Sequence, residues 1–311
     1  MKKVFIDGSS GTTGLKIYER LSSRKDIELI TLSDEIRKDI NARKDALNSA
    51  DIAFLCLPDD AARESVSLTD NPNTAIIDTS TAHRTAPGWV YGLPELTEQR
   101  EKVRASKRVA NPGCHATGFI ALVAPLVEAG IVARDARLSC FSLTGYSGGG
   151  KKMIAQYEAE GRDKLLDAPR QYGVAQKHKH LPEMSKVCGL EVAPVFCPIV
   201  APYFAGMEVT VTLHSQDING DIEALKDCYR NYYKDGVIYF TDGDDFAEGG
   251  FLSAGAFAGR DDLEITIQGN DERILLVSRF DNLGKGASGA AIQNMNIILG
   301  LDETTGLNVR S

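Results

Sequence analysis

A cysteine at the start of a predicted helix is the residue of this chain best suited to covalent chemistry. Cys114 follows the turn-forming residues Asn111-Pro112-Gly113 and precedes a long helical pattern. The partial positive charge of a helix N-terminus stabilises a thiolate, which is the nucleophilic form of cysteine. The position indicates attack on a carbonyl carbon. A cysteine at a buried helix start can also serve as a small packed hydrophobic residue, and that alternative stays open at this point.

Two histidines and an acid form the second group with catalytic potential. They lie in Lys177-His178-Lys179-His180-Leu181-Pro182-Glu183, where an extended chain would point both imidazoles the same way. An imidazole that meets Cys114 in the folded chain would move protons near neutral pH, which thiolate catalysis requires. Metal binding is not favoured, because no third ligand follows at a suitable spacing. Solvated surface histidines remain the alternative.

A glycine-rich run precedes two lysines in the middle of the chain. Residues 145–150 contain four glycines, among them Gly148, and Lys151 and Lys152 follow. Closely spaced glycines expose backbone N–H groups that can form an anion-binding nest. The run is typical either of a site for a phosphate-bearing substrate or of a flexible connector between a strand and a helix.

The first elements of the chain predict a dinucleotide site. A short apolar strand at residues 4–7 leads into a glycine-rich turn and then into a helical pattern. Glycines spaced three apart let the backbone approach a pyrophosphate, with the helix N-terminus facing its charge. The candidate cofactor-binding residues of this turn are Gly8, Ser10, Gly11, Thr12, Thr13 and Gly14.

Further strands alternate with helical stretches through the first third of the chain. They are predicted at residues 27–32, 51–58 and 74–78. This alternation predicts an α/β fold with a Rossmann-type, doubly wound parallel sheet. After the second strand, Asp34 or Glu35 would suit the ribose 2′-hydroxyl of NAD, whereas Ser33, Arg37 and Lys38 would suit the 2′-phosphate of NADP. The segment alone does not decide between the two cofactors.

The second half of the chain is rich in strands from Val192 onward. Strands at 263–267 and 274–278 flank a predicted hairpin turn, which indicates an α+β domain with a mostly antiparallel sheet. The small residues at the start of the last helix would allow it to return to the nucleotide-binding domain. We expect residues 1–113 and 285–311 to form the NADP-binding Rossmann domain and residues 114–284 to form the catalytic α+β domain.

Composition narrows the class of protein. A length of 311 residues suits two domains, and a formal net charge of -8 argues against a nucleic-acid surface. No apolar run reaches the roughly 18 residues that a membrane span needs. The six cysteines lack paired or metal-like spacing, so we expect reduced thiols in a cytoplasmic protein.

Together these motifs resemble the N-acetyl-gamma-glutamyl-phosphate reductase family of the semialdehyde dehydrogenase-like superfamily, and its shorter second type most strongly. The resemblance covers nearly the whole chain. It rests on residues 8–14, Tyr91-Gly92-Leu93-Pro94-Glu95-Leu96, Asn111-Pro112-Gly113-Cys114, His178 to Glu183 and Asn282-Leu283-Gly284-Lys285-Gly286-Ala287. In one departure, His115 stands where the family commonly has tyrosine.

The resemblance implies an activity and a set of roles. The activity is NADPH-dependent reduction of N-acetyl-L-glutamyl 5-phosphate to the 5-semialdehyde and phosphate, through a cysteine thioester, in arginine biosynthesis. Cys114 would be the nucleophile and His180 its acid-base partner. The expected contacts to NADP(H), besides the glycine turn, are Gly284, Lys285, Gly286, Ser33 and Arg37. The expected contacts to the acyl phosphate substrate are Asn111, Arg84, Gly148 and His178. A homodimer or homotetramer is expected, because the second-domain sheet commonly forms interfaces in this superfamily.

Three alternatives remain at this point. Aspartate-semialdehyde dehydrogenase shares the thiolate and the cofactor fold, but the His-x-His-x-Pro-Glu segment argues against it. A carrier-bound form of the same substrate, used in lysine biosynthesis, would carry similar motifs. A non-catalytic NADPH-binding sensor is disfavoured by the presence of both Cys114 and His180.

Overall fold

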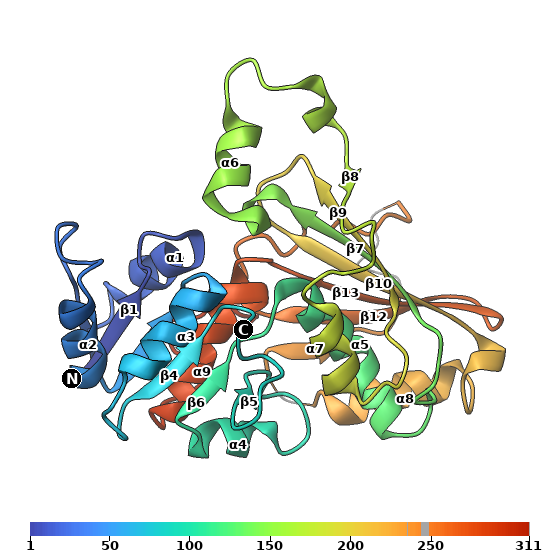
Figure 1. Cartoon of the computed structure of the whole chain (residues 1–311). Helices are drawn as coiled ribbons and strands as arrows, with labels where there is room; N and C mark the ends of the chain where they lie inside the picture. Colours follow the sequence, from blue (N-terminus) through green and yellow to red (C-terminus); the bar gives the residue numbers. More distant parts are fainter. Residues whose placement is uncertain (235, 244–248, 311) are drawn as a thin grey trace. The chain divides into compact units, whose positions relative to one another are not determined.

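The computed structural model describes residues 1–234, 236–243 and 249–310. The chain divides into two compact units, and each is described by itself (Figure 1). The first unit consists of Met1–Pro112 together with Ala287–Leu307. The second consists of Gly113–Gly286, joined by the end of the chain from Asn308.

A six-stranded sheet with the order β2-β1-β3-β4-β6-β5 forms the centre of the first unit. All of its strand pairs are parallel, which confirms the predicted doubly wound sheet. The second and third strands are shorter than the sequence suggests. The bounds are β1 Lys2–Asp7, β2 Ile27–Ile30, β3 Ile52–Leu55, β4 Ala75–Asp78, β5 Val90–Tyr91 and β6 Arg108–Ala110.

Because successive side chains of these strands point to opposite faces, the sheet has a hydrophobic core on each face. In β1, Val4 and Ile6 pack with residues of α1 and α9, whereas Phe5 packs with residues of α2 and α3. Successive side chains of a strand point to opposite faces, so a strand buried on both sides reads as a continuous apolar run. The helices are α1 Thr12–Leu21, α2 Ile40–Ser49, α3 Asp59–Leu68, α4 Gln99–Ala105 and α9 Gly289–Ile298.

The second unit is built on a mixed seven-stranded sheet with the order β11-β12-β13-β10-β7-β9-β8 (Figure 1). Four of its six strand pairs are antiparallel, and β7–β9 and β11–β12 are parallel. The predicted hairpin joins β12 to β13, with Gly269 opposite Ile274. The bounds are β7 Ser139–Gly145, β8 Arg170–Gln171, β9 Val195–Ala201, β10 Met207–His214, β11 Ile238–Phe240, β12 Leu263–Gly269 and β13 Arg273–Phe280.

Helix α5 (Cys114–Glu128) packs against this sheet, and most of its residues are buried. Gly118 permits the close approach, because a Cβ at this position would lie 2.5 Å from the Val209 side chain and 2.8 Å from that of Phe280. The other helices are α6 Gly150–Glu158, α7 Leu181–Cys188 and α8 Ile222–Tyr232, and the short helical turns are η1 Tyr146–Gly149, η2 Lys164–Asp167, η3 Ser215–Asp217 and η4 Gly284–Ser288. Every helix in the described part of the chain is too short or too polar to cross a bilayer.

Candidate active site

Cys114 is the first residue of α5, as the sequence predicts. Gly113 precedes it in an extended conformation, so the chain turns sharply into the helix. The N–H groups of the first helical turn have no acceptor within the helix and therefore face whatever lies at its start. Gly286 lies against this position, because a Cβ built on it would come within 2.9 Å of the Cys114 Cβ. The second unit thus brings the glycine segment 284–286 beside the candidate nucleophile.

Cys114 is more exposed than Cys140 and Cys188, which are buried. Cys114 is half-buried, and the described residues contain no disulfide. Burial raises the pKa of the Cys56 thiol to about 12 and also raises the pKa of Cys140 and Cys188 above the ordinary range. All three thiols therefore stay protonated near neutral pH, and the buried Cys140 and Cys188 act as packed apolar groups.

Glu183 connects the Cys114 turn to the second candidate group. Its carboxylate is almost fully buried in the first turn of α7. One oxygen accepts the backbone N–H of Gly113 at 3.2 Å, and the other lies 3.8 Å from Nε2 of His180. The sequence motif contains Glu183, but the pattern alone gave it no role, because its burial and its reach to Gly113 depend on the fold.

His178 and His180 come together around a third histidine. The His178 and His180 ring centroids are 4.7 Å apart, and they lie 5.8 Å and 5.5 Å from the ring of His115. The segment forms a turn, in which the N–H of His180 donates to Nδ1 of His178 at 3.2 Å, so the two imidazoles meet through this turn and not through the alternation of an extended chain. Among the described residues, no group of three or more His, Cys, Asp or Glu is arranged to hold a metal ion.

His115 is a buried, uncharged histidine that bridges two hydroxyl groups. Its Nδ1 lies 2.6 Å from the Ser142 Oγ, and its Nε2 lies 2.5 Å from the Tyr172 Oη. Burial, and then the nearby charge of His178, lowers the pKa of His115 to about 3. The imidazole is therefore neutral at physiological pH, and its two nitrogens act as one donor and one acceptor.

The first unit contains a pocket of about 360 Å³ at the carboxyl ends of its strands. Gly8, Ser10 and Gly11 of the predicted glycine turn line it, and Tyr18 and Leu32 are among its apolar lining residues. Gly14 lies in the first turn of α1 behind them, where a Cβ would collide with the Gly8 carbonyl oxygen at 2.4 Å. Thr12 and Thr13 share that turn and, like Gly14, are outside the described lining.

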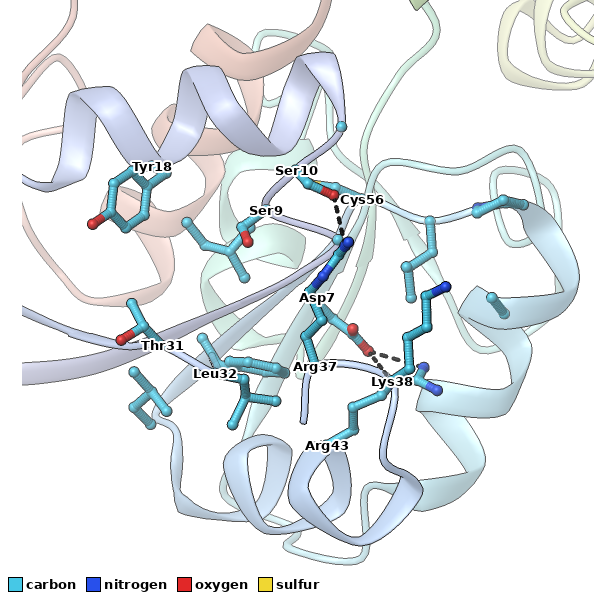
Figure 2. A pocket seen from close by; sticks show the side chains of 18 residues that line it. Asp7, Ser9, Ser10, Tyr18, Thr31, Leu32, Arg37, Lys38, Arg43 and Cys56 are labelled. Carbon is cyan, nitrogen blue, oxygen red and sulfur yellow. Dashed lines mark hydrogen bonds and ion pairs between the residues drawn. The ribbon is translucent and has the colours of Figure 1, made fainter. Parts of the chain in front are cut away.

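Basic side chains reach this pocket from the segment after β2. Arg37 donates to the Ser10 Oγ at 3.1 Å, and Lys38 also lines the pocket (Figure 2). Arg37 also pairs with Asp34 at 2.9 Å. Ser33 lies outside the described lining. Of the residues proposed from this segment, Arg37 and Lys38 therefore face the pocket.

A buried ion pair that the sequence gave no reason to expect supports the same pocket. Arg43 donates to Oδ2 of Asp7 at 3.1 Å (Figure 2). The Ser65 hydroxyl donates to the same oxygen at 2.7 Å. Asp7 ends β1 immediately before the glycine turn, so these bonds fix the strand end from which the turn departs. Asp7, Arg43 and Ser65 are far apart in the sequence, so a local sequence pattern could not predict their contact.

Arg84 and Asn111 lie together in the first unit. Nε of Arg84 donates to the Asn111 carbonyl oxygen at 3.0 Å, and its Nη2 donates to the Thr79 carbonyl oxygen at 3.2 Å. The Asn111 amide donates to the Ala287 carbonyl oxygen at 3.0 Å. These bonds hold the guanidinium at the carboxyl ends of β4 and β6, the edge where parallel sheets bind ligands.

The glycine-rich run forms regular structure in the second unit. Gly148 lies in η1, and the run continues directly into α6. Asn282 fastens the segment, since its amide donates to the Ser147 Oγ at 2.9 Å. The run therefore forms a helical turn that joins β7 to α6, and this arrangement does not choose between a connector and a phosphate site.

Two family models of known proteins each match one part of the chain. The model "Semialdehyde dehydrogenase, NAD binding domain" matches residues 3–105, and "Semialdehyde dehydrogenase, dimerisation domain" matches residues 114–282. The chain is 45% identical to "N-acetyl-gamma-glutamyl-phosphate reductase 2" of Pseudomonas putida, covering 96% of each protein. It is also 45% identical to the protein of that name from a Nostoc species, covering 98% of this chain and 99% of the relative.

Solved structures share the fold at much lower identity. A probable aspartate-semialdehyde dehydrogenase from Pseudomonas aeruginosa aligns with a TM-score of 0.72 at 17% identity, covering 96% of this chain and 98% of that one. The Candida albicans aspartate semialdehyde dehydrogenase with NADP aligns with a TM-score of 0.64 at 15% identity, covering 96% and 99%. At these identities the likeness concerns the fold alone.

The depressed pKa of His115 predicts a particular loss of stability in acid. Between pH 6.5 and about 3 the folded state keeps His115 neutral, whereas the unfolded chain protonates it, so stability falls as the pH falls. In this pH range His115 alone changes the free energy of unfolding by about 1.4 kcal/mol per pH unit. Urea titrations at pH 7, 6, 5 and 4 should therefore show a shallower decline in the free energy of unfolding for His115→Gln than for the unmodified protein. The matched control is His214→Gln, which removes an exposed histidine and should keep the original slope. Parallel curves for His115→Gln and the unmodified protein would contradict the interpretation.

Proposed function

The chain belongs to the semialdehyde dehydrogenase family, among relatives named N-acetyl-gamma-glutamyl-phosphate reductase, and we propose that it reduces N-acetyl-L-glutamyl 5-phosphate to the 5-semialdehyde and phosphate in arginine biosynthesis. The observation that carries the proposal is Cys114 at the start of α5, with His180 and Glu183 in the same unit. The six cysteines carry no disulfide, which suits the cytoplasm that we expect for this pathway.

Cys114 starts the reaction as a thiolate. Its sulfur attacks the acyl carbon of the substrate, a C–S bond forms, and the C–O bond to phosphate breaks, which leaves a thioester on the enzyme. A bound NADPH supplies the hydride that reduces the thioester carbonyl. The C–S bond of the resulting thiohemiacetal then breaks. The aldehyde is released, and the Cys114 sulfur returns to the thiolate or thiol form.

His180 is the acid-base group in this series of reaction steps. It accepts the thiol proton of Cys114 before attack and returns a proton when the sulfur is released. Glu183 orients the imidazole and stabilises its protonated form, since its carboxylate lies 3.8 Å from Nε2. The N–H groups at the start of α5 stabilise the tetrahedral oxyanion, a contribution of about 2.7–4 kcal/mol per donor at other acyl-transfer sites.

The pocket of the first unit fits NADPH. Gly8, Ser10 and Gly11 form the cradle that a pyrophosphate needs, next to the N-terminus of α1. Arg37 and Lys38 supply positive charge for the 2′-phosphate. We assign Gly284 to Gly286 to the nicotinamide end, because Gly286 lies against Cys114.

The acyl phosphate needs partners for its phosphate and its carboxylate. We assign Arg84 to one of these anionic groups, because its guanidinium is held by backbone carbonyls and keeps its charge. Asn111, Gly148 and His178 are the further substrate contacts in this proposal.

We also propose a homodimer formed through the open face of the second-unit sheet. Phe141, Val195 and Leu275 are large apolar side chains with exposed fractions of 43%, 56% and 38%. Strand register places them on one face: Phe141 is opposite Thr210, and Leu275 is opposite Thr212. An apolar sheet face of this kind is typical of a protein interface, and it agrees with a match to a domain described as a dimerisation domain.

The reverse reaction tests the substrate and the nucleophile together. With N-acetylglutamate semialdehyde, phosphate and NADP, the enzyme should produce NADPH. Cys114→Ser should retain NADP binding and lose activity by orders of magnitude, because the serine hydroxyl is a far weaker nucleophile than a thiolate. Cys228→Ser, which changes another half-buried cysteine, is the matched control and should keep full activity. Full turnover by Cys114→Ser would exclude the thioester route, and turnover restricted to a carrier-bound semialdehyde would assign the chain to the lysine-pathway reaction instead.

Cofactor preference should depend on Arg37. Removal of a charged hydrogen-bond donor to phosphate costs about 1.5–3 kcal/mol, so Arg37→Ala should raise the KM for NADP roughly 10- to 100-fold and leave kcat/KM with NAD nearly unchanged. Ser33→Ala is the control, since Ser33 lies outside the pocket lining, and it should keep the original KM. Steady-state kinetics with both cofactors measure the effect. An equal loss with NAD and NADP would contradict the assignment.

A charge on the open sheet face should separate the subunits. Phe141→Asp places an unpaired carboxylate in the proposed interface, so sedimentation velocity should show monomers where the unmodified protein forms dimers. Leu165→Asp changes a more exposed apolar residue that is not on the sheet face and should leave the dimer intact. A dimer that persists in Phe141→Asp would place the interface elsewhere.

A further inference from the structure

Three side chains from distant segments form a line of hydrogen bonds beside Cys114. Ser142 lies on β7, His115 is the second residue of α5, and Tyr172 directly follows β8. The distances are 2.6 Å from the Ser142 Oγ to Nδ1 and 2.5 Å from Nε2 to the Tyr172 Oη. Both hydroxyl groups can donate or accept, so the direction of the line depends on which imidazole nitrogen carries the proton.

The surroundings of Ser142 set that direction. Its side chain is fully buried, and among the described residues its hydroxyl has one hydrogen-bond partner, Nδ1 of His115. A buried hydroxyl that donates to nothing is costly, so the Ser142 O–H donates to Nδ1. Nδ1 is then the acceptor, and the proton of the neutral imidazole lies on Nε2 and is donated to the Tyr172 Oη. The hydroxyl proton of Tyr172 is consequently not consumed by His115.

Tyr172 lies within a group of rings that includes His115, the residue that follows the candidate nucleophile. Its ring is 5.8 Å from that of His178, which is 4.7 Å from that of His180. Burial, and then the charge of Cys114, raises the pKa of Tyr172 well above its usual range, so the phenol stays protonated. The titratable groups gathered around it are Cys114, His115, His178, His180 and Glu183.

We propose that Tyr172 is a catalytic residue whose hydroxyl donates a hydrogen bond to the Cys114 thiolate, and that His115 and Ser142 are positioning residues that keep this proton available. The proposal rests on the proposed function, in which Cys114 reacts as a thiolate. The donated bond favours the thiolate before attack on the acyl carbon. It favours the same sulfur again when the C–S bond of the thiohemiacetal breaks, and no proton leaves Tyr172 in either step.

Alkylation of Cys114 by iodoacetamide, followed across pH in the enzyme without substrate, tests the donor. The rate follows the thiolate fraction, and peptide mass spectrometry assigns it to Cys114. Tyr172→Phe removes one oxygen and keeps the ring. Its alkylation midpoint should rise by about 1–2 pH units, the equivalent of one hydrogen bond to a charged group. An unchanged midpoint in a variant that melts like the unmodified protein would overturn the proposal.

Ser142 supplies a second test at a distance from the sulfur. In Ser142→Ala no hydroxyl donates to Nδ1, so the contact that holds the His115 proton on Nε2 is lost, and Nε2 can accept the Tyr172 proton and divert it from Cys114. The alkylation midpoint should rise in the same direction as in Tyr172→Phe, whereas Ser142→Thr retains a hydroxyl and should restore it. A midpoint in Ser142→Ala equal to that of the unmodified protein would refute the positioning role.

Alkylation needs neither substrate nor cofactor, so its result is independent of the proposed reaction. An unshifted midpoint together with normal N-acetylglutamate semialdehyde oxidation would reject Tyr172 and leave the proposed function standing. A shifted midpoint together with no such oxidation would support the donor and reject the substrate assignment.

Discussion

The Gly113 N–H donates to the buried Glu183 carboxylate at 3.2 Å, and this bond fastens the start of α5 to the start of α7. The chemistry of the second unit depends on it, because it fixes where Cys114 lies and which side chains surround it. Helix α5 cannot adjust easily, since most of its length is buried and Gly118 seats it directly against the sheet. The second oxygen of Glu183 lies 3.8 Å from His180, so one carboxylate orients both the thiol turn and its candidate acid-base partner.

The electrostatic character of this site follows from the same arrangement. The helix N-terminus contributes a fixed partial positive charge, and the buried His115 contributes none, because its pKa is lowered to about 3. A neutral imidazole can transmit the direction of a hydrogen bond without adding charge beside a thiolate. Burial meanwhile raises the pKa of Cys56, Cys140 and Cys188, so these three thiols stay protonated and are poor nucleophiles near neutral pH.

Local patterns were sufficient to predict the parts of the protein that local interactions form. The strand, glycine turn and helix at 4–14 and the helix that starts at Cys114 were of this kind, since their turns and helix starts are written in neighbouring residues. Glu183 and Tyr172 were not predictable as partners of the Cys114 turn. They lie about sixty to seventy residues away, and the packing of α5 on α7 and the pairing of β7, β9 and β8 bring them there.

The central claim is that Cys114 forms a thioester before any hydride is delivered. Intact-protein mass spectrometry after mixing the enzyme with N-acetyl-L-glutamyl 5-phosphate in the absence of NADPH tests it most directly. We expect one N-acetylglutamyl adduct per chain, located on Cys114 and removed by hydroxylamine, with one phosphate released for each adduct. Phosphate retained until NADPH is added, or an adduct on another residue, would contradict it.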